Sequence, residues 1–399
     1  MLTHAKPAPV GAKFWTPGVI VLLALMGIGF FFIIARYIGG LAAVTNLNNS
    51  YPWGLWIGVD VETGVAMAAG GFTTAALVHI FGRHKYKAIT RSALLAAMLG
   101  YTAVALSLAV DVGRTWAMWF PIVLYRNPNS VLFEVATCVT IYLNVLYIEF
   151  IPIVMERLKG KISLPGRFAV YDETIEKLLD FLDRILGRVM WVFIIAGVVL
   201  SCMHQSSLGS LMLVAPTKCH PLWYTPILPL LFLTSAITVG FPIAFFVYTI
   251  ATTSLRLDSE MDVFTPLTRI TAFLLGAYMV LKIGDMVVRG SYIHLLENTV
   301  QSTSFLVEMV VGVIIPWCML LSQKVRRSKR ALFISCTLIV GGVALNRMNV
   351  FLVAYRPQYT ETSYFPSIGE MAVTAAFIAG VIFFYRVCVT YFPVLGSRR

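Results

Sequence analysis

The chain has 399 residues, of which 58% are hydrophobic and 13% are charged, and its formal net charge is +12. A soluble domain carries about 25% charged residues, so this composition excludes an ordinary water-soluble fold. The positive charge gathers in the loops between apolar segments, where it serves membrane topology and contact with anionic lipid. We therefore expect a protein surrounded by membrane lipid that has no nucleic acid as a partner.

Ten apolar stretches follow one another along the chain, and each is near or above the roughly 20 residues that a helix needs to cross the hydrocarbon layer. Backbone groups in lipid must pair internally, so each stretch is expected to be a helix. The absence of alternating hydrophobicity argues against a membrane barrel. The sequence therefore predicts an all-α polytopic membrane protein. The expected spans are 17–38, 53–80, 91–112, 130–155, 187–204, 223–253, 267–288, 301–322, 331–354 and 368–391.

Outside the spans, the sequence offers no separate soluble domain. Residues 1–16 and 392–399 are expected to be cytoplasmic tails around a transmembrane domain at 17–391. In the longest connection, apolar residues recur at helical spacing from about 167 to 186, with charges on the other face. This pattern predicts an amphipathic helix on the cytoplasmic surface. No clear cleavage site follows the first span, which is interpreted as an uncleaved anchor.

The basic residues fall on one side of the predicted membrane. Of the 31 Lys and Arg residues, 22 lie in the two tails and in every second connection, whereas five lie in the intervening loops. Positive loops remain in the cytoplasm. We therefore expect both termini in the cytoplasm of a bacterial inner membrane protein, with the first, third, fifth, seventh and ninth connections outside.

Cysteine and histidine spacing argues against a bound redox cofactor. The six cysteines are scattered and none of them forms a C-x-x-C motif, so neither an iron–sulfur cluster nor covalent haem is expected in this chain. No two histidines lie within spans at matching depth, as a bis-histidine haem would require. We also expect no metal site.

Acidic residues inside spans are costly and therefore mark candidate functional positions. Glu134 and Glu149 are separated by fifteen residues, which is about 60° beyond four full turns and roughly 22 Å along a helix. One helix face thus carries carboxylates near both membrane surfaces, as a proton route requires. Alternatively, each of them pairs with a basic residue on a neighbouring helix. Lys282 and Asp285, three residues apart, could simply pair with each other.

Hydrogen-bonding side chains gather at the outer end of the fifth span. A quinone head group presents two carbonyl acceptors, so its site needs donors between apolar and aromatic walls. His204, Gln205, Ser206 and Arg114 can supply such donors. The alternative is a polar helix end that water satisfies.

Five motifs occur in order along the chain, at residues 51–56, 111–116, 129–134, 203–212 and 220–223. Together they resemble the NrfD/PsrC-type integral membrane family of polysulfide and nitrite reductase systems. Within it, the chain looks most like the branch of hydrogenase-2 "cytochrome b" membrane subunits (HybB-like), which includes subunits of sulfate-reducer redox complexes. The resemblance covers nearly the whole chain, although Ala69-Gly70-Gly71 stands where hydrogenase-type relatives often have Cys-Gly-Gly.

The resemblance implies two four-helix bundles, to which we add two further helices, and a membrane subunit that binds menaquinone or ubiquinone but contains no haem. It also implies a periplasmic ferredoxin-like iron–sulfur subunit as electron partner, with a multihaem cytochrome or a hydrogenase or reductase as catalytic subunit. The family's tyrosine in the third span and glutamate at the start of the fourth match Tyr101 and Glu134.

We therefore predict a quinone-interacting subunit of a periplasm-facing respiratory complex rather than a stand-alone enzyme. Proton translocation accompanies this role if protons reach the quinone from the cytoplasm. The alternatives are an ion or proton transporter, a passive anchor of a periplasmic oxidoreductase, and a haem b electron carrier. The predicted quinone-binding residues are His204, Gln205, Ser206, Arg114, Asp111, Tyr101 and Trp53, and the predicted proton-transfer residues are Glu134, Tyr101, Asp60 and Glu149.

Overall fold

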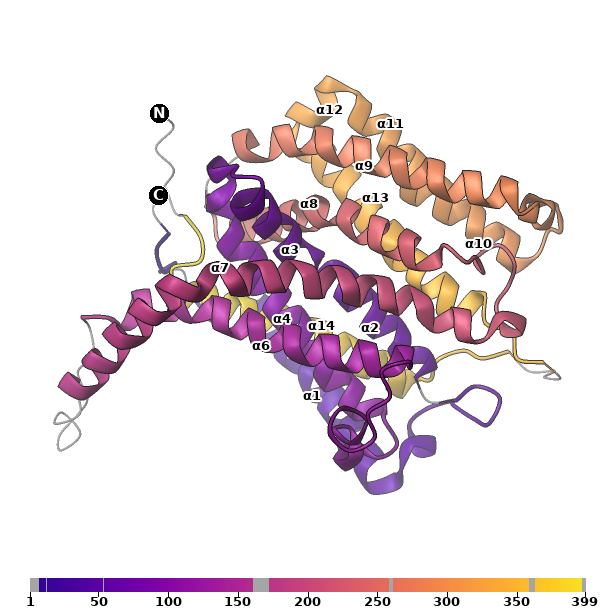
Figure 1. Ribbon diagram of the computed structural model, residues 1–399, viewed down its shortest axis with the longest axis horizontal. Coiled ribbons are helices and arrows are strands. Elements are labelled where there is room, and N and C mark those ends of the chain that lie inside the picture. Colours follow the sequence, from indigo (N-terminus) through magenta and orange to yellow (C-terminus); the bar gives the residue numbers. More distant parts are fainter. Residues whose placement is uncertain are drawn as a thin grey trace.

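The computed structural model describes residues 7–11, 13–52, 54–160, 172–257, 261–358 and 363–396. Helices dominate these residues, and the only β contacts among them are two isolated bridges, between Pro7 and Gly396 and between Cys219 and Tyr355. The first bridge brings the described ends of the chain together. Figure 1 shows most of the long helices running side by side along the horizontal axis of the view.

The described residues include ten helical segments that are long and apolar enough to cross a membrane, which confirms the predicted spans to within several residues for most of them. The chain is therefore a multi-pass all-α protein. Several spans are composite, and the fifth is much longer than predicted. The span helices are α1 (Pro17–Gly39), α2 (Leu55–Met67) with α3 (Ala69–Ala75), α4 (Lys87–Asp111), α6 (Val131–Leu158), α7 (Asp172–Ser210), α8 (Leu228–Ser254), α9 (Met261–Val288), α10 (Val300–Met309) with α11 (Ile315–Leu321), α13 (Lys329–Met348) and α14 (Ile368–Tyr391).

These helices form two four-helix bundles. The first bundle contains α2–α3, α4, α6 and α7, and the second contains α8, α9, α10–α11 and α13. Helices α2, α3 and α7 of the first bundle pack on α8, and α2 also packs on α13, so the bundles share one interface. Helices α1 and α14 pack against each other, and α14 also packs against α4. The expected arrangement of two bundles and two further helices is confirmed.

Three spans contain a π-helical turn, at residues 76–80, 310–314 and 349–353. Such turns shift the faces of a helix and often mark functional sites. The turn at 310–314 brings Gly312 against Gly342 of α13 so closely that a Cβ atom on either glycine would overlap the other backbone. Small residues permit this backbone contact, as is common where membrane helices cross.

The predicted amphipathic segment is continuous with the fifth span. Residues 172–186 are helical, as expected, but α7 runs without a break from Asp172 to Ser210. The start of the predicted segment, 167–171, lies outside the described residues. The position of this segment on the membrane surface stays a prediction.

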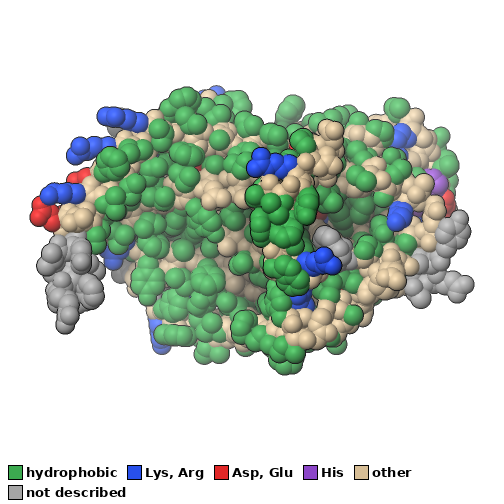
Figure 2. Space-filling view, turned by 60° about the horizontal axis from the view of Figure 1, so that its bottom comes forward, with side chains coloured by type: hydrophobic (Ala, Val, Ile, Leu, Met, Phe, Trp, Pro, Cys, Tyr) green, Lys and Arg blue, Asp and Glu red, His purple; other side chains and the backbone are tan. Residues whose placement is uncertain are grey.

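Apolar side chains cover most of the face that Figure 2 shows. Helix α1 illustrates this surface, because Ile20, Phe30 and Phe31 are each more than 60% exposed. Lipid is the solvent that such side chains require.

We use the term weakly basic face for one end of the molecule, where the described residues of five connections lie. These connections carry five Lys and Arg residues in all. They are residues 40–54, 112–130, 215–227, 289–299 and 354–367.

Candidate functional site

His204 lies inside the first bundle and is completely buried. Its Nδ1 is 3.2 Å from the hydroxyl of Tyr101, and the ring of Tyr101 meets that of Tyr142 edge-on, with 4.6 Å between centroids. Helices α7, α4 and α6 each contribute one of these side chains. The other ring nitrogen of His204, Nε2, has no hydrogen-bond partner among the described residues. If the hydroxyl of Tyr101 donates to Nδ1, then Nε2 carries the proton and is a buried donor that a ligand can satisfy.

Gln205 supplies the complementary group. Its side-chain Nε2 donates to the carbonyl oxygen of Val65 at 2.8 Å, which ties α7 to α2. Its Oε1 is buried, and no described residue donates a hydrogen bond to it. Adjacent residues of α7 therefore hold one donor and one acceptor without partners inside the bundle. We define His204, Tyr101, Tyr142 and Gln205 as the His204 cluster.

Glu134 and Glu149 share one face of α6, as the fifteen-residue spacing predicted, and that face packs on α7. The hydroxyl of Ser207 lies 2.6 Å from Oε1 of Glu134. Glu149 lies against Gly197 of α7. A Cβ atom on Gly197 would be only 2.9 Å from Oε1 of Glu149. Ser207 and Gly197 are ten residues apart, or about 15 Å along α7. The two carboxylates thus occupy different depths along one helix–helix interface.

Asp111 and Asp60 lie in a different place from the His204 cluster. They line a cavity of about 30 Å³ together with Arg36 and Glu370, between α1, α2, α4 and α14. Asp111 accepts a hydrogen bond from the amide of Gly54 at 2.7 Å. A cavity of this size holds about one water molecule and is too small for a quinone ring. We name Arg36, Asp60, Asp111 and Glu370 the carboxylate cavity.

The predicted quinone-binding residues are therefore divided. Asp111 is ten residues from Tyr101, or about 15 Å along α4. Arg114 is exposed in the loop after α4, and the buried cation beside Asp111 is instead Arg36, whose Nη2 donates to the carbonyl oxygen of Val112 at 2.5 Å. Ser206 is partly buried next to the His204 cluster. Trp53 lies outside the described residues.

The predicted proton-transfer residues Asp60 and Glu149 lie at different depths. Asp60 is five residues from the start of α2, about 8 Å below the weakly basic face, and accepts a hydrogen bond from Thr374 at 2.6 Å. Glu149 is eighteen residues from the start of α6, which is about 27 Å from the same face. The structure therefore does not bring these two carboxylates together.

An apolar groove of about 440 Å³ runs along α1, α4 and α14. Its lining includes Ile33, Leu106 and Ala376, each within about one helical turn of a residue that lines the carboxylate cavity. Its apolar lining suits a lipid or isoprenoid chain. It lies on the side of α4 that faces α1 and α14, whereas Tyr101 faces α6 and α7.

The sequence reasoning missed a charged cluster in the second bundle. Lys282 forms an ion pair with Glu308, and their side chains are 6% and 1% exposed. The alternative that Lys282 pairs with Asp285 is wrong, because Asp285 instead pairs with Arg289 at 2.8 Å. A partial signal was present, since Glu308 is the only charged residue of its predicted span and Lys282 lies in the preceding one.

Further polar groups complete this cluster around Glu308. The indole of Trp223 and the amides of Asn346 and Asn349 donate to its carboxylate at 3.0, 2.9 and 2.8 Å. Asn346 in turn accepts from Arg347, at 2.8 Å. A carboxylate that receives a lysine and three neutral donors is fully satisfied in the absence of water. We call Lys282, Glu308, Asn346, Asn349 and Arg347 the second-bundle charge cluster.

Glu62 lies between the two bundles. It is 1% exposed, and neither of its carboxylate oxygens has a hydrogen-bond partner among the described residues. Arg347, also fully buried, is near enough to interact with it electrostatically. Glu62 thus places an ionisable group between the first bundle and the second-bundle charge cluster. The sequence shows that Glu62 lies in a span. It does not show that Arg347 of α13 is near it, because that proximity arises only when the two bundles pack together.

The sequence pattern of the family described as "Polysulphide reductase, NrfD" matches residues 43–357 of this chain. The chain is 35% identical to the "Probable Ni/Fe-hydrogenase 2 b-type cytochrome subunit" of Escherichia coli, over 98% of this chain and 96% of that protein. It is 24% identical to the "Hdr-like menaquinol oxidoreductase integral membrane subunit" of Archaeoglobus fulgidus, over 95% and 93% of the two chains. A shorter match, 30% identical, covers 42% of this chain and 36% of the "Menaquinone reductase, integral membrane subunit" of Nitratidesulfovibrio vulgaris.

Proposed function

This chain belongs to the polysulphide reductase NrfD family, and we propose that it is the quinone-interacting membrane subunit of a respiratory redox complex. Relatives named as menaquinone reductase and menaquinol oxidoreductase subunits support a quinone as its substrate. The observation that carries the proposal is the pair of buried groups without partners, Nε2 of His204 and Oε1 of Gln205. A buried polar group without a partner is destabilising, so a ligand that satisfies both groups gains binding energy at this point.

The two groups suit the two redox forms of a quinone. An Nε2–H on His204 donates to a carbonyl oxygen of the quinone, and Oε1 of Gln205 accepts from a hydroxyl of the quinol. The rings of Tyr101 and Tyr142 provide aromatic walls. The apolar groove beside the carboxylate cavity is a second location for a quinone, because its volume of about 440 Å³ is large enough for a ring. Substitutions in the His204 cluster distinguish the two locations.

Reduction of a quinone consumes two electrons and two protons, and oxidation of the quinol releases them. Tyr101 and Glu134 are proposed to carry protons at the site, because Tyr101 contacts His204 and Glu134 contacts Ser207. Asp60, near the weakly basic face, and Glu149, on the opposite side of the site, are proposed as further proton carriers. Movement of one charge across the membrane stores about 2.3 kcal/mol per 100 mV.

The electrons are proposed to come from, or pass to, a ferredoxin-like iron–sulfur subunit docked on the weakly basic face, with a multihaem cytochrome, hydrogenase or reductase as the catalytic subunit. The relatives' names support such an assembly, since they describe subunits of hydrogenase and reductase complexes. Menaquinone and ubiquinone both fit the donor and acceptor of the His204 cluster.

The weakly basic face is proposed to face the periplasm, with both termini in the cytoplasm of a bacterial inner membrane. The charge bias between the two faces supports this orientation.

Cysteine labelling tests the orientation. A cysteine at the exposed position Thr217 is expected to react in intact cells with a membrane-impermeant maleimide. A cysteine at the exposed position Ser328 is expected to react only after lysis. Labelling of the unaltered chain sets the background from its native cysteines. The reverse pattern would refute the orientation.

Quinone turnover by the whole complex tests the site. The variant His204→Leu removes the ring donor and is expected to lower the rate of quinone reduction or quinol oxidation at least about fivefold, because loss of a buried polar contact costs about 1–3 kcal/mol. Electron transfer from the catalytic subunit to a soluble dye should stay unchanged. Thr140→Ala is the matched control, because Thr140 is exposed on α6 and its hydroxyl hydrogen-bonds to its own helix backbone. Unchanged quinone turnover in His204→Leu would favour a passive anchor or the apolar groove.

A further inference from the structure

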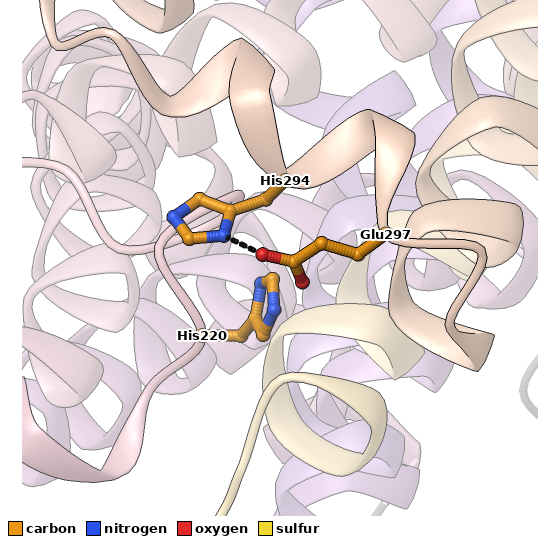
Figure 3. Close-up of side chains that lie close together, drawn as sticks. All are labelled: His220, His294 and Glu297. Carbon is orange, nitrogen blue, oxygen red and sulfur yellow. Dashed lines mark hydrogen bonds and ion pairs between the residues drawn. The ribbon is translucent and has the colours of Figure 1, made fainter.

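Three potential metal ligands meet outside the spans, at the weakly basic face. His220 lies in the connection between α7 and α8, whereas His294 and Glu297 lie at the short helix Ser291–Leu296 and directly after it. One ligand atom from each residue lies within 4.8 Å of the other two. Figure 3 shows the two imidazoles and the carboxylate converging from two separate loops.

The chain positions all three side chains. The amide of His220 donates to the carbonyl oxygen of Ala354 at 2.8 Å, and its buried ring packs against Trp223 with 6.0 Å between centroids. The three-residue spacing of His294 and Glu297 places their side chains on one side of a 3₁₀ turn. Nδ1 of His294 lies 2.5 Å from the carboxylate of Glu297, and the two imidazole centroids are 5.4 Å apart.

We propose that His220, His294 and Glu297 form a binding site for a divalent transition-metal cation, with Zn²⁺ as the best match. Two imidazole nitrogens and one carboxylate oxygen are a ligand set that zinc accepts in sites with an open fourth position. Ligands around a tetrahedral ion with bonds of about 2.1 Å lie roughly 3.5 Å apart. Side-chain shifts of about 1 Å therefore complete the site, with water or a residue of a docked subunit as the fourth ligand.

This inference does not depend on quinone binding, because the three residues lie in the second half of the chain, outside the spans. The site also adjoins the second-bundle charge cluster, since Trp223 contacts His220 and donates its indole hydrogen to Glu308. A bound cation would hold the loop at residue 220 to residues 291–297, next to the second-bundle charge cluster.

Zinc binding by the purified complex tests the proposal. After chelator treatment, the unaltered protein is expected to bind one more Zn²⁺ per chain than the double variant His294→Ala/Glu297→Ala in equilibrium dialysis. Both residues lie at the surface, so the double variant is expected to fold, which a thermal melt checks. His84→Ala, an exposed histidine at the opposite end of the molecule, should bind as the unaltered chain does.

Cobalt gives a second readout. Co²⁺ bound at the site should produce the visible absorption of a four-coordinate ion in the unaltered protein and lose it in the single variant His294→Ala. Equal zinc uptake by the unaltered chain and a folded double variant would overturn the proposal, and the contact between His294 and Glu297 would then be only a hydrogen-bonded pair at the surface.

Discussion

The substitution Lys282→Met is expected to reduce strongly the amount of folded chain that can be extracted from the membrane. It removes the cation that neutralises Glu308, and Glu308 is 1% exposed in the middle of the second bundle. The loss of one partner from a buried ion pair leaves an uncompensated charge and costs about 3–5 kcal/mol. This cost is a large part of the stability of a typical protein. Trp223, Asn346 and Asn349 cannot replace the lost charge, because they are neutral donors.

Extraction in mild detergent, followed by size-exclusion chromatography and a thermal melt, measures this effect. Lys177→Met is the matched control, because Lys177 pairs with Glu173 in an ion pair that is more than 70% exposed and contributes little. The double variant Lys282→Met/Glu308→Gln should recover part of the lost stability, since both charges are then absent. If Lys282→Met melts at the temperature of the unaltered chain, the ion pair does not stabilise the fold.

The substitution Glu134→Gln is expected to lower quinone-coupled turnover by about two orders of magnitude while the complex still assembles. The amide of glutamine has nearly the shape of the carboxylate and still accepts a hydrogen bond from Ser207, but it cannot bind and release a proton. Removal of a positioned acid or base costs about 10²–10⁴ in rate. Because Glu134 lies in the first turn of α6 and is only partly buried, the change should leave the packing of the bundle intact.

Turnover of quinone by the purified complex in proteoliposomes checks this prediction. Glu156→Gln is the control on the same helix, because Glu156 pairs with Arg91 at an exposed end of α6 and has no proposed role in proton transfer. Reduction of a soluble dye by the catalytic subunit should be equal in both variants and in the unaltered chain. Full quinone turnover in Glu134→Gln would remove this residue from the proton path.

The fold was predictable because each span is a local property of the sequence. Span length and apolar composition follow from the thickness of the bilayer, and the sequence carries both directly. The shared face of Glu134 and Glu149 was predictable for a similar reason, since the rotation per residue of a helix is fixed. The length of α7 was not predicted, because the change from charged to apolar composition near residue 187 indicates a boundary, although no proline interrupts residues 172–210.

The arrangement of the site depends on which helices touch, and the sequence does not carry this information. His204 and Asp111 are both polar residues near the same end of their spans, yet His204 faces the interior of the first bundle and Asp111 faces α1 and α14. The cation beside Asp111 is Arg36, which is distant in the sequence, rather than its near neighbour Arg114. The ion pair of Lys282 and Glu308 likewise joins two helices, so only packing reveals it.

The most direct test of this account is the binding of a quinone analogue to the purified complex. A hydroxyquinoline N-oxide, whose fluorescence is quenched when it binds, is titrated against the unaltered chain, His204→Leu and Glu149→Gln. We predict that His204→Leu weakens binding at least about fivefold, because the buried donor to the head group is lost. Glu149 lies against Gly197, about two helical turns from His204, so Glu149→Gln should bind as the unaltered chain does. Equal affinity in the unaltered chain and His204→Leu would contradict the placement of the quinone in the first bundle.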